Sequence, residues 1–148
     1  MNSFAALTVL VLAVVHLSVQ DGLTEEQQKR IAQYRADCIK EIGVNPELIE
    51  KADNGNFVED DKLKCFTKCF YQKAGFIDDK GEILIDVIKS KIPEGVDKDK
   101  ALEVIETCKK HVGANTCETA YLVHKCYFEH NRKYHEAQAA AAAAAAKS

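Results

Sequence analysis

The sequence Cys65-Phe66-Thr67-Lys68-Cys69 decides how this chain folds. It lies within residues 60–75, where apolar residues recur at helical spacing and residues suited to helix caps stand at both ends. Two cysteines four positions apart project from the same face of a helix, one turn above each other. A disulfide between them would close only a small local loop. We therefore expect each of them to bond to a different part of the chain.

The ends of the sequence differ in composition from its middle. Residues 1–20 carry no charged side chain and include an apolar run of the length of a secretory signal, so we expect a signal peptide cleaved between Ser18 and Gly22. No second apolar run long enough to span a bilayer follows. The 148 residues have a net charge of −3 with lysine and glutamate interspersed, which gives no indication of nucleic-acid binding. We expect a secreted, extracellular protein that is not embedded in a membrane.

Capping residues and apolar periodicity predict an all-α domain over residues 21–130. The six predicted helices cover residues 24–43, 45–51, 60–75, 82–92, 97–113 and a last one that opens at Asn115 and holds Phe128. Residues 82–92 fit a strand as well as a buried helix, and their helical neighbours favour a helix. Residues 131–148 form a polar tail with eight consecutive alanines. Alanine could extend the last helix, but the run has little apolar bulk, so we expect a frayed or disordered end.

All six cysteines follow the predicted signal, which in a secreted chain indicates three disulfides. Six cysteines permit fifteen pairings. Cys117 and Cys126 lie nine residues apart in one predicted helix, roughly 13 Å apart, which is beyond the reach of a disulfide. Excluding that bond and the local Cys65–Cys69 bond leaves ten pairings. In every one of them the central helix and the last helix each make two disulfides to other parts of the chain.

The cysteine spacing resembles that of a known family. The intervals between successive cysteines are 26, 3, 38, 8 and 8 residues, and residues 65–81 also resemble the central helix and turn of the insect odorant-binding proteins. This pheromone and general odorant-binding family includes the short general odorant-binding proteins of flies, which this chain resembles most. The resemblance implies six helices stapled around an apolar cavity. It also implies the disulfides Cys38–Cys69, Cys65–Cys117 and Cys108–Cys126.

The sequence lacks recognisable catalytic machinery. It contains no G-x-S-x-G, H-E-x-x-H or glycine-rich phosphate loop, so we expect no enzyme, no catalytic site and no cofactor. The spacing of Cys65, Cys69, Cys108 and His111 imitates a zinc site. A secreted protein favours disulfides at such cysteines, so we expect no metal site.

A cavity for hydrophobic ligands would be lined by large apolar residues and a few polar ones. The candidate lining residues are Phe66, Thr67, Phe70, Leu84, Ile88, Val104, Ile105, Tyr121, Leu122 and Phe128. For each of them, ordinary core packing explains the pattern equally well. Thr67, Gln72, Tyr121 and Tyr127 could also offer hydrogen bonds to a ligand. Four histidines gather toward the C-terminal side, His111, His124, His130 and His135, so a pH-gated pocket is a further hypothesis.

These patterns favour a carrier over the other function classes. We expect reversible binding of odorants, pheromones or related small hydrophobic ligands, which the resemblance implies are carried through extracellular fluid to a membrane olfactory receptor. We expect a monomer or weak homodimer. One alternative is a lipophilic carrier outside olfaction, in taste, haemolymph or reproductive secretions. Another is a disulfide-rich interaction protein without a ligand.

Overall fold

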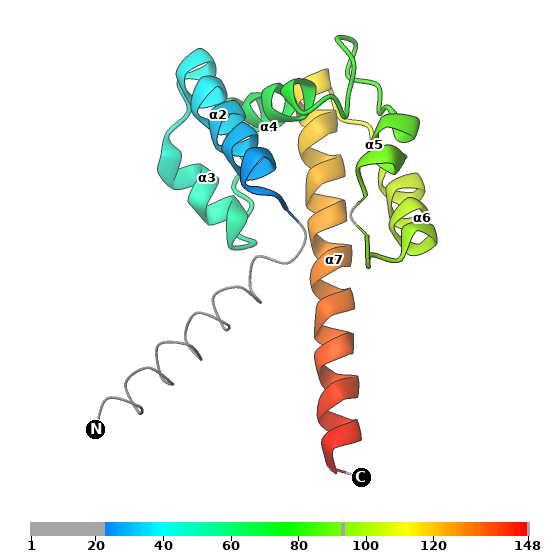
Figure 1. Ribbon diagram of the computed structural model, residues 1–148. Coiled ribbons are helices and arrows are strands. Elements are labelled where there is room, and N and C mark those ends of the chain that lie inside the picture. The colour runs from blue at the N-terminus through cyan, green and yellow to red at the C-terminus, as the bar shows by residue number, and fades with distance from the viewer. Residues whose placement is uncertain (1–22, 93, 148) are drawn as a thin grey trace, which may run out of the picture.

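The structure is a computed structural model that describes residues 23–92 and 94–147. Within these residues the chain forms six helices: α2 (Glu25–Ile42), α3 (Pro46–Asp53), α4 (Asp61–Lys73), α5 (Ile85–Lys91), α6 (Lys98–Cys108) and α7 (Thr116–Lys147) (Figure 1). None of these helices is both long and apolar enough to cross a membrane. The signal peptide predicted for residues 1–20 lies outside the described residues and stays a prediction.

Most of the predicted helix starts are confirmed by their caps. Thr24 and Gln27 form a capping box at the start of α2, in which each side chain accepts a hydrogen bond from the other residue's backbone N–H. Gly43 ends α2 with a left-handed backbone (φ 70°), which glycine adopts without a steric penalty. The Asp60 side chain accepts a hydrogen bond from the Leu63 N–H, at 2.8 Å, and so starts α4.

The segment that fits both a strand and a helix contains one isolated β-bridge residue followed by a short helix. Ile83 forms an isolated antiparallel bridge with Ile77, and α5 begins only at Ile85. Between the two isoleucines the Asp78 carboxylate accepts hydrogen bonds from the backbone N–H groups of Lys80 and Glu82, at 2.8 and 2.9 Å. This side chain holds the turn that pairs the two isoleucines, so the helix starts later than expected.

Helix α6 ends at Cys108, five residues before the predicted end at Gly113. The loop after it obtains its hydrogen bonds from the start of α7. The Gly113 N–H donates to Thr119 Oγ1 at 2.9 Å, and the Ala114 N–H donates to Glu118 Oε2 at 2.6 Å. Glu118 also pairs with Lys64 of α4, at 3.1 Å. These tertiary partners replace the hydrogen bonds that further turns of α6 would have made.

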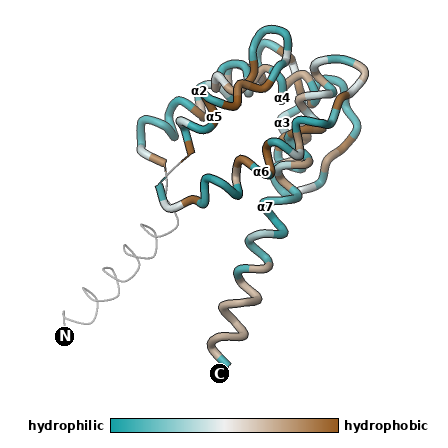
Figure 2. Tube along the Cα trace, turned by 90° about the vertical axis from the view of Figure 1, so that its right-hand side faces the viewer, coloured by the Kyte–Doolittle hydropathy of each residue, from teal (hydrophilic) through white to brown (hydrophobic). Residues whose placement is uncertain are grey.

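The expectation of a frayed C-terminal end is wrong, because α7 continues through the alanines to Lys147. Its 32 residues span about 48 Å at 1.5 Å per residue. Beyond Phe128 every described side chain is exposed, and this half projects away from the other helices (Figure 1). In Figure 2 it changes from hydrophilic to moderately hydrophobic colour where the alanines begin. The packed first half supplies the costly nucleus, so alanines only have to propagate a helix that already exists.

Three disulfides join the helices around α4, which packs against both α2 and α7. Cys38–Cys69 ties α2 to α4, Cys65–Cys117 ties α4 to α7, and Cys108–Cys126 ties α6 to α7. These are the pairs that the family resemblance implies. The buried core beside them contains Cys38, Val44, Ile49, Ala52, Leu63, Phe66, Cys69 and Tyr121.

Candidate ligand-binding site

An aromatic cluster fills the junction of α4 and α7. We define the aromatic cluster as the side chains of Phe57, Tyr71, Phe76, Tyr121, His124 and Phe128. The Phe57 ring lies at its centre, with ring centroids 5.9 Å from Tyr121, 5.8 Å from His124 and 5.3 Å from Phe128. All three contacts are edge-to-face, the arrangement that aromatic quadrupoles favour. The junction is therefore apolar with defined geometry.

Helical spacing explains why α7 supplies half of the aromatic cluster. Tyr121, His124 and Phe128 stand at positions i, i+3 and i+7, so their side chains share one face of the helix. Tyr71 comes from the last turns of α4, and its ring centroid lies 5.6 Å from that of His124. Phe57 comes from the segment between α3 and α4.

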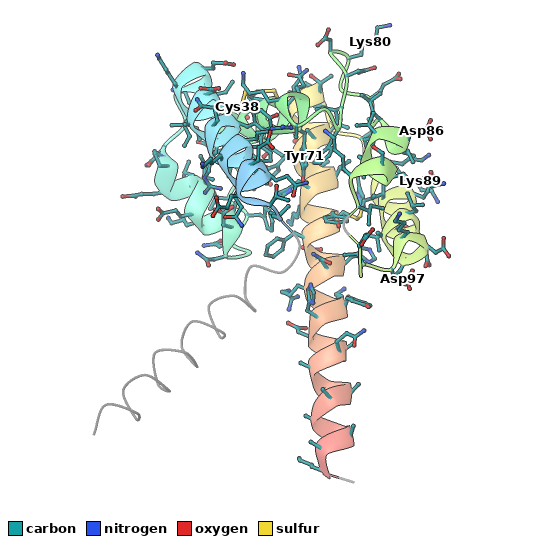
Figure 3. The ribbon with its side chains drawn as sticks, viewed as in Figure 1. Cys38, Tyr71, Lys80, Asp86, Lys89 and Asp97 are labelled. Atoms are coloured by element: carbon teal, nitrogen blue, oxygen red, sulfur yellow. A yellow bond between two sulfur atoms is a disulfide. The ribbon has the colours of Figure 1, made fainter. Side chains whose placement is uncertain are left out.

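Two polar groups of the aromatic cluster form a hydrogen bond with each other. The Tyr71 hydroxyl and His124 Nδ1 form a hydrogen bond between α4 and α7, and Figure 3 shows Tyr71 beside α7. Burial raises the pKa of the Tyr71 hydroxyl above its ordinary value. Burial also lowers the pKa of His124 below 6.5, although the charge of Asp53 opposes that shift. Both side chains are therefore neutral at pH 7, which suits an apolar site.

Other polar groups that were expected to face a ligand are already bonded to the backbone. The Tyr121 hydroxyl donates to the Val58 carbonyl at 2.6 Å, and burial raises its pKa to about 12. The Thr67 hydroxyl donates to the Leu63 carbonyl at 3.1 Å. The Gln72 amide donates to the Asp78 carbonyl at 3.2 Å. The hydroxyl protons of Tyr121 and Thr67 and one of the two amide protons of Gln72 are therefore used within the protein.

Residues 20–130 match the model of the PBP/GOBP family. The chain belongs to this family. General odorant-binding protein 56a of Drosophila melanogaster is 30% identical over 130 residues, which are 86% of this chain and 92% of the relative. Among solved structures, the fatty acid binding protein OBP56a from the oral disk of the blowfly Phormia regina has a TM-score of 0.62 and 26% identity. The match covers 75% of this chain and 96% of the blowfly protein.

A third similar protein was solved with a bound compound. Odorant binding protein 7 from Anopheles gambiae, in complex with an azo compound, has a TM-score of 0.63 and 27% identity. The match covers 76% of this chain and 91% of the mosquito protein. These likenesses confirm the predicted all-α fold with its disulfide staples.

Within this PBP/GOBP fold, the ten predicted lining residues do not form one group. Phe66 and Phe70 lie on α4 with ring centroids 6.3 Å apart, beside the buried Thr67. Tyr121 and Phe128 belong to the aromatic cluster, and Leu122 is a half-buried neighbour on α7. Val104 and the buried Ile105 stand on α6, which packs against α7. Leu84 and Ile88 lie at α5, where Leu84 is exposed.

The prediction of lining residues missed Phe57, Tyr71 and Phe76. A signal for Tyr71 was present, because it continues the α4 stripe of Leu63 and Thr67 at intervals of four. Phe57 lies outside any helix, so no periodicity could have placed it. His124 entered the prediction only as a titratable group, although it shares a helix face with Tyr121 and Phe128.

Described residues line two open depressions on the surface. One lies over α3, bordered by Glu47, Glu50, Lys51, Asn54 and Asn56. The other follows α7 and is bordered by Phe128, Asn131, Arg132, His135, Glu136 and Ala139. Of the predicted lining residues only Phe128 borders either hollow. The enclosed apolar cavity therefore stays a prediction.

Disulfide formation uses the cysteines that imitate a zinc site. Cys65, Cys69 and Cys108 each belong to a different disulfide, so they cannot act as thiolate ligands beside His111. In the described part of the chain, the sulfurs of Cys108 and Cys126 lie within 4.8 Å of a His130 ring nitrogen. Those two sulfurs are bonded to each other, so this group is a disulfide beside a histidine.

Proposed function

We propose that the protein is a secreted carrier that reversibly binds small hydrophobic ligands at the aromatic cluster between α4 and α7. The observation that carries this proposal is that cluster itself: the rings of Phe57 and Tyr71 contact His124, and the Tyr71 hydroxyl and His124 Nδ1 form a hydrogen bond with each other. The fold supports the proposal, because three disulfides stabilise the helices without requiring a fully packed core.

The proposed mechanism is partition of the ligand from water into the protein. Burying apolar surface contributes about 25 cal/mol per Å², so a ligand that buries ~300 Å² gains ~7 kcal/mol. Immobilising the ligand costs part of this gain. Micromolar to weaker dissociation constants follow, which allow a carrier both to load and to release its ligand.

The proposal also names the residues that contact the ligand and the place to which the ligand is delivered. Phe66 and Phe70 extend the aromatic surface of α4 toward α2, where Tyr34 meets Phe70 at a centroid distance of 6.5 Å. We place the ligand against these rings and the aromatic cluster. Delivery to a membrane olfactory receptor is the proposed role in olfaction. The blowfly relative comes from an oral disk, which supports a carrier in taste as the second candidate.

Displacement of a fluorescent apolar probe tests the proposal. The oxidised, folded protein should take up the probe at a saturable single site, and unlabelled odorant-like molecules should displace it competitively. Phe57→Ala removes the central ring of the aromatic cluster and should weaken probe binding about tenfold, whereas Val112→Ala at an exposed position should leave it unchanged. Absence of saturable uptake by the folded protein would favour an interaction protein without a ligand.

A further inference from the structure

The hydrogen bond between Tyr71 and His124 fixes where the imidazole carries its proton. The Tyr71 hydroxyl is buried at the junction of α4 and α7, and His124 Nδ1 is its hydrogen-bond partner among the described residues. A buried hydroxyl has one proton and must donate it to avoid a desolvation cost. Tyr71 therefore donates and Nδ1 accepts. In a neutral imidazole the proton then resides on Nε2.

His124 Nε2–H is consequently a donor that is not used within the described part of the protein. All of the hydrogen bonding of His124 to described residues runs through Nδ1. Among the same residues, no fully buried side-chain nitrogen or oxygen lacks a partner. Among the described residues, Nε2 therefore has neither a hydrogen-bond partner nor complete burial. Phe57 and Tyr71 flank the imidazole with centroids 5.8 and 5.6 Å away, so a molecule that reaches Nε2 meets apolar ring surface on either side.

We propose that His124 Nε2–H is the specificity-determining donor of the ligand site, selecting apolar ligands that carry a neutral acceptor oxygen, such as ketones, aldehydes and esters. The inference rests on the proposed carrier function and names the ligand class of that site. The donor exists because Tyr71 occupies the other ring nitrogen. A hydrocarbon of the same length gains the same apolar burial but leaves Nε2–H unpaired.

Because His124 is uncharged, the proposed site favours ligands with a neutral acceptor oxygen over ligands with a carboxylate. His124 is neutral at pH 7, so it offers a carboxylate a hydrogen bond without a compensating positive charge. The negative charge of Asp53 acts on His124 electrostatically, and its ion pair with Arg35 offsets part of the repulsion that a ligand carboxylate would meet. An ester should therefore bind more tightly than the free acid with the same carbon chain.

A matched pair of ligands tests this inference. The affinities of a long-chain methyl ketone and of the alkane of equal length are measured by probe displacement on the wild-type protein and on His124→Leu. The leucine keeps apolar bulk but removes the donor. The ratio of ketone to alkane affinity should fall about fivefold, with the alkane affinity unchanged. His124→Gln, whose amide can both accept from Tyr71 and donate to a ligand, should restore the ratio to within about twofold.

The results separate this inference from the proposed function. An unchanged ratio in His124→Leu, with both ligands still bound, would overturn the role of Nε2–H and leave the carrier function standing. If neither ligand displaces the probe from the wild-type protein, both the carrier function and the role of Nε2–H are overturned. If His124→Leu does not fold, nitrogen NMR of the wild-type imidazole decides instead. Nδ1 should be unprotonated and Nε2 protonated at neutral pH, and the ketone, but not the alkane, should shift the Nε2 proton. A proton found on Nδ1 would overturn the inference.

Discussion

The Tyr71 hydroxyl and His124 Nδ1 form a hydrogen bond that joins α4 to α7 within the aromatic cluster. The other contacts within the aromatic cluster are between the edges and faces of rings. The hydrogen bond requires an unprotonated nitrogen on His124, so the junction depends on the ionisation of one side chain. The burial of that side chain lowers its pKa, which keeps the junction intact at neutral pH.

The first prediction concerns stability against pH. Unfolded His124 gains its proton near pH 6.5, while the folded protein resists protonation because the pKa of His124 is lowered. The unfolded state then binds more protons, so the free energy of unfolding should fall as pH drops from about 6.5 toward the folded pKa, by at most about 1.4 kcal/mol per pH unit from this group. Urea unfolding between pH 7.5 and 5 measures this slope.

The histidine responsible can be assigned by substitution. His124→Gln should flatten the pH dependence of stability between pH 6.5 and 5, because the amide does not titrate. His130→Gln, which changes an exposed histidine of the same helix, should leave the slope as it is. An equal slope in wild type and His124→Gln would show that His124 does not couple folding to pH.

The second prediction concerns the bond from Tyr121 to the segment before α4. Tyr121 is 1% exposed, and its hydroxyl donates to the Val58 carbonyl. Tyr121→Phe should therefore lower the free energy of unfolding by about 1–2 kcal/mol, since it leaves that carbonyl without this partner. Tyr127→Phe, at a 37% exposed position on the same helix, should change it by less than about 0.5 kcal/mol. Equal effects of the two substitutions in urea unfolding would contradict this account.

Local sequence signals predicted most of the helices. The predictions failed where a helix end depends on residues from another helix. Thr24, Asn45 and Asp60 cap the helices that they were expected to start, because a cap needs only neighbouring residues. The early end of α6 was not predictable in this way, since it depends on Thr119 and Glu118 from α7. The prediction of a frayed end for residues 131–148 was wrong because it assumed that the alanines need packing to stay helical. Propagation of the existing helix α7 is sufficient.

The candidate site was only partly predictable for the same reason. Tyr121 and Phe128 follow the apolar period of α7, and the sequence therefore indicates their face. Phe57 completes the aromatic cluster from a segment without periodicity, so only the folded chain shows that it contacts both of them. The Tyr71–His124 bond joins residues 53 positions apart and leaves no local pattern.

The third prediction ranks the disulfides by the length of chain that each one closes. Sequence separations are 52 for Cys65–Cys117, 31 for Cys38–Cys69 and 18 for Cys108–Cys126. In the chain-entropy model their contributions are about 4.1, 3.7 and 3.2 kcal/mol. Replacing each pair with alanines should lower the urea midpoint most for Cys65–Cys117 and least for Cys108–Cys126. A reversed order would mean that packing around each bridge outweighs chain entropy.

The fourth prediction concerns the projecting half of α7. Ala142→Pro should break the helix there, because proline costs about 3 kcal/mol in a helix interior. Far-UV circular dichroism should show a loss of helix while the urea midpoint of the body stays the same, since the side chains beyond Phe128 are exposed. Ala142→Glu, which retains a helix-forming residue, should leave both measurements unchanged. A lowered midpoint in Ala142→Pro would indicate that the alanines support the body.

Locating a bound ligand by NMR tests directly whether the aromatic cluster between α4 and α7 is the ligand site. A carbon-labelled long-chain ketone is added to the oxidised protein, and nuclear Overhauser effects between ligand and side-chain protons are recorded. Contacts are expected with the rings of Phe57, Tyr71 and His124 at the junction of α4 and α7. Contacts restricted to the surface hollows over α3 or along the projecting half of α7 would contradict this expectation.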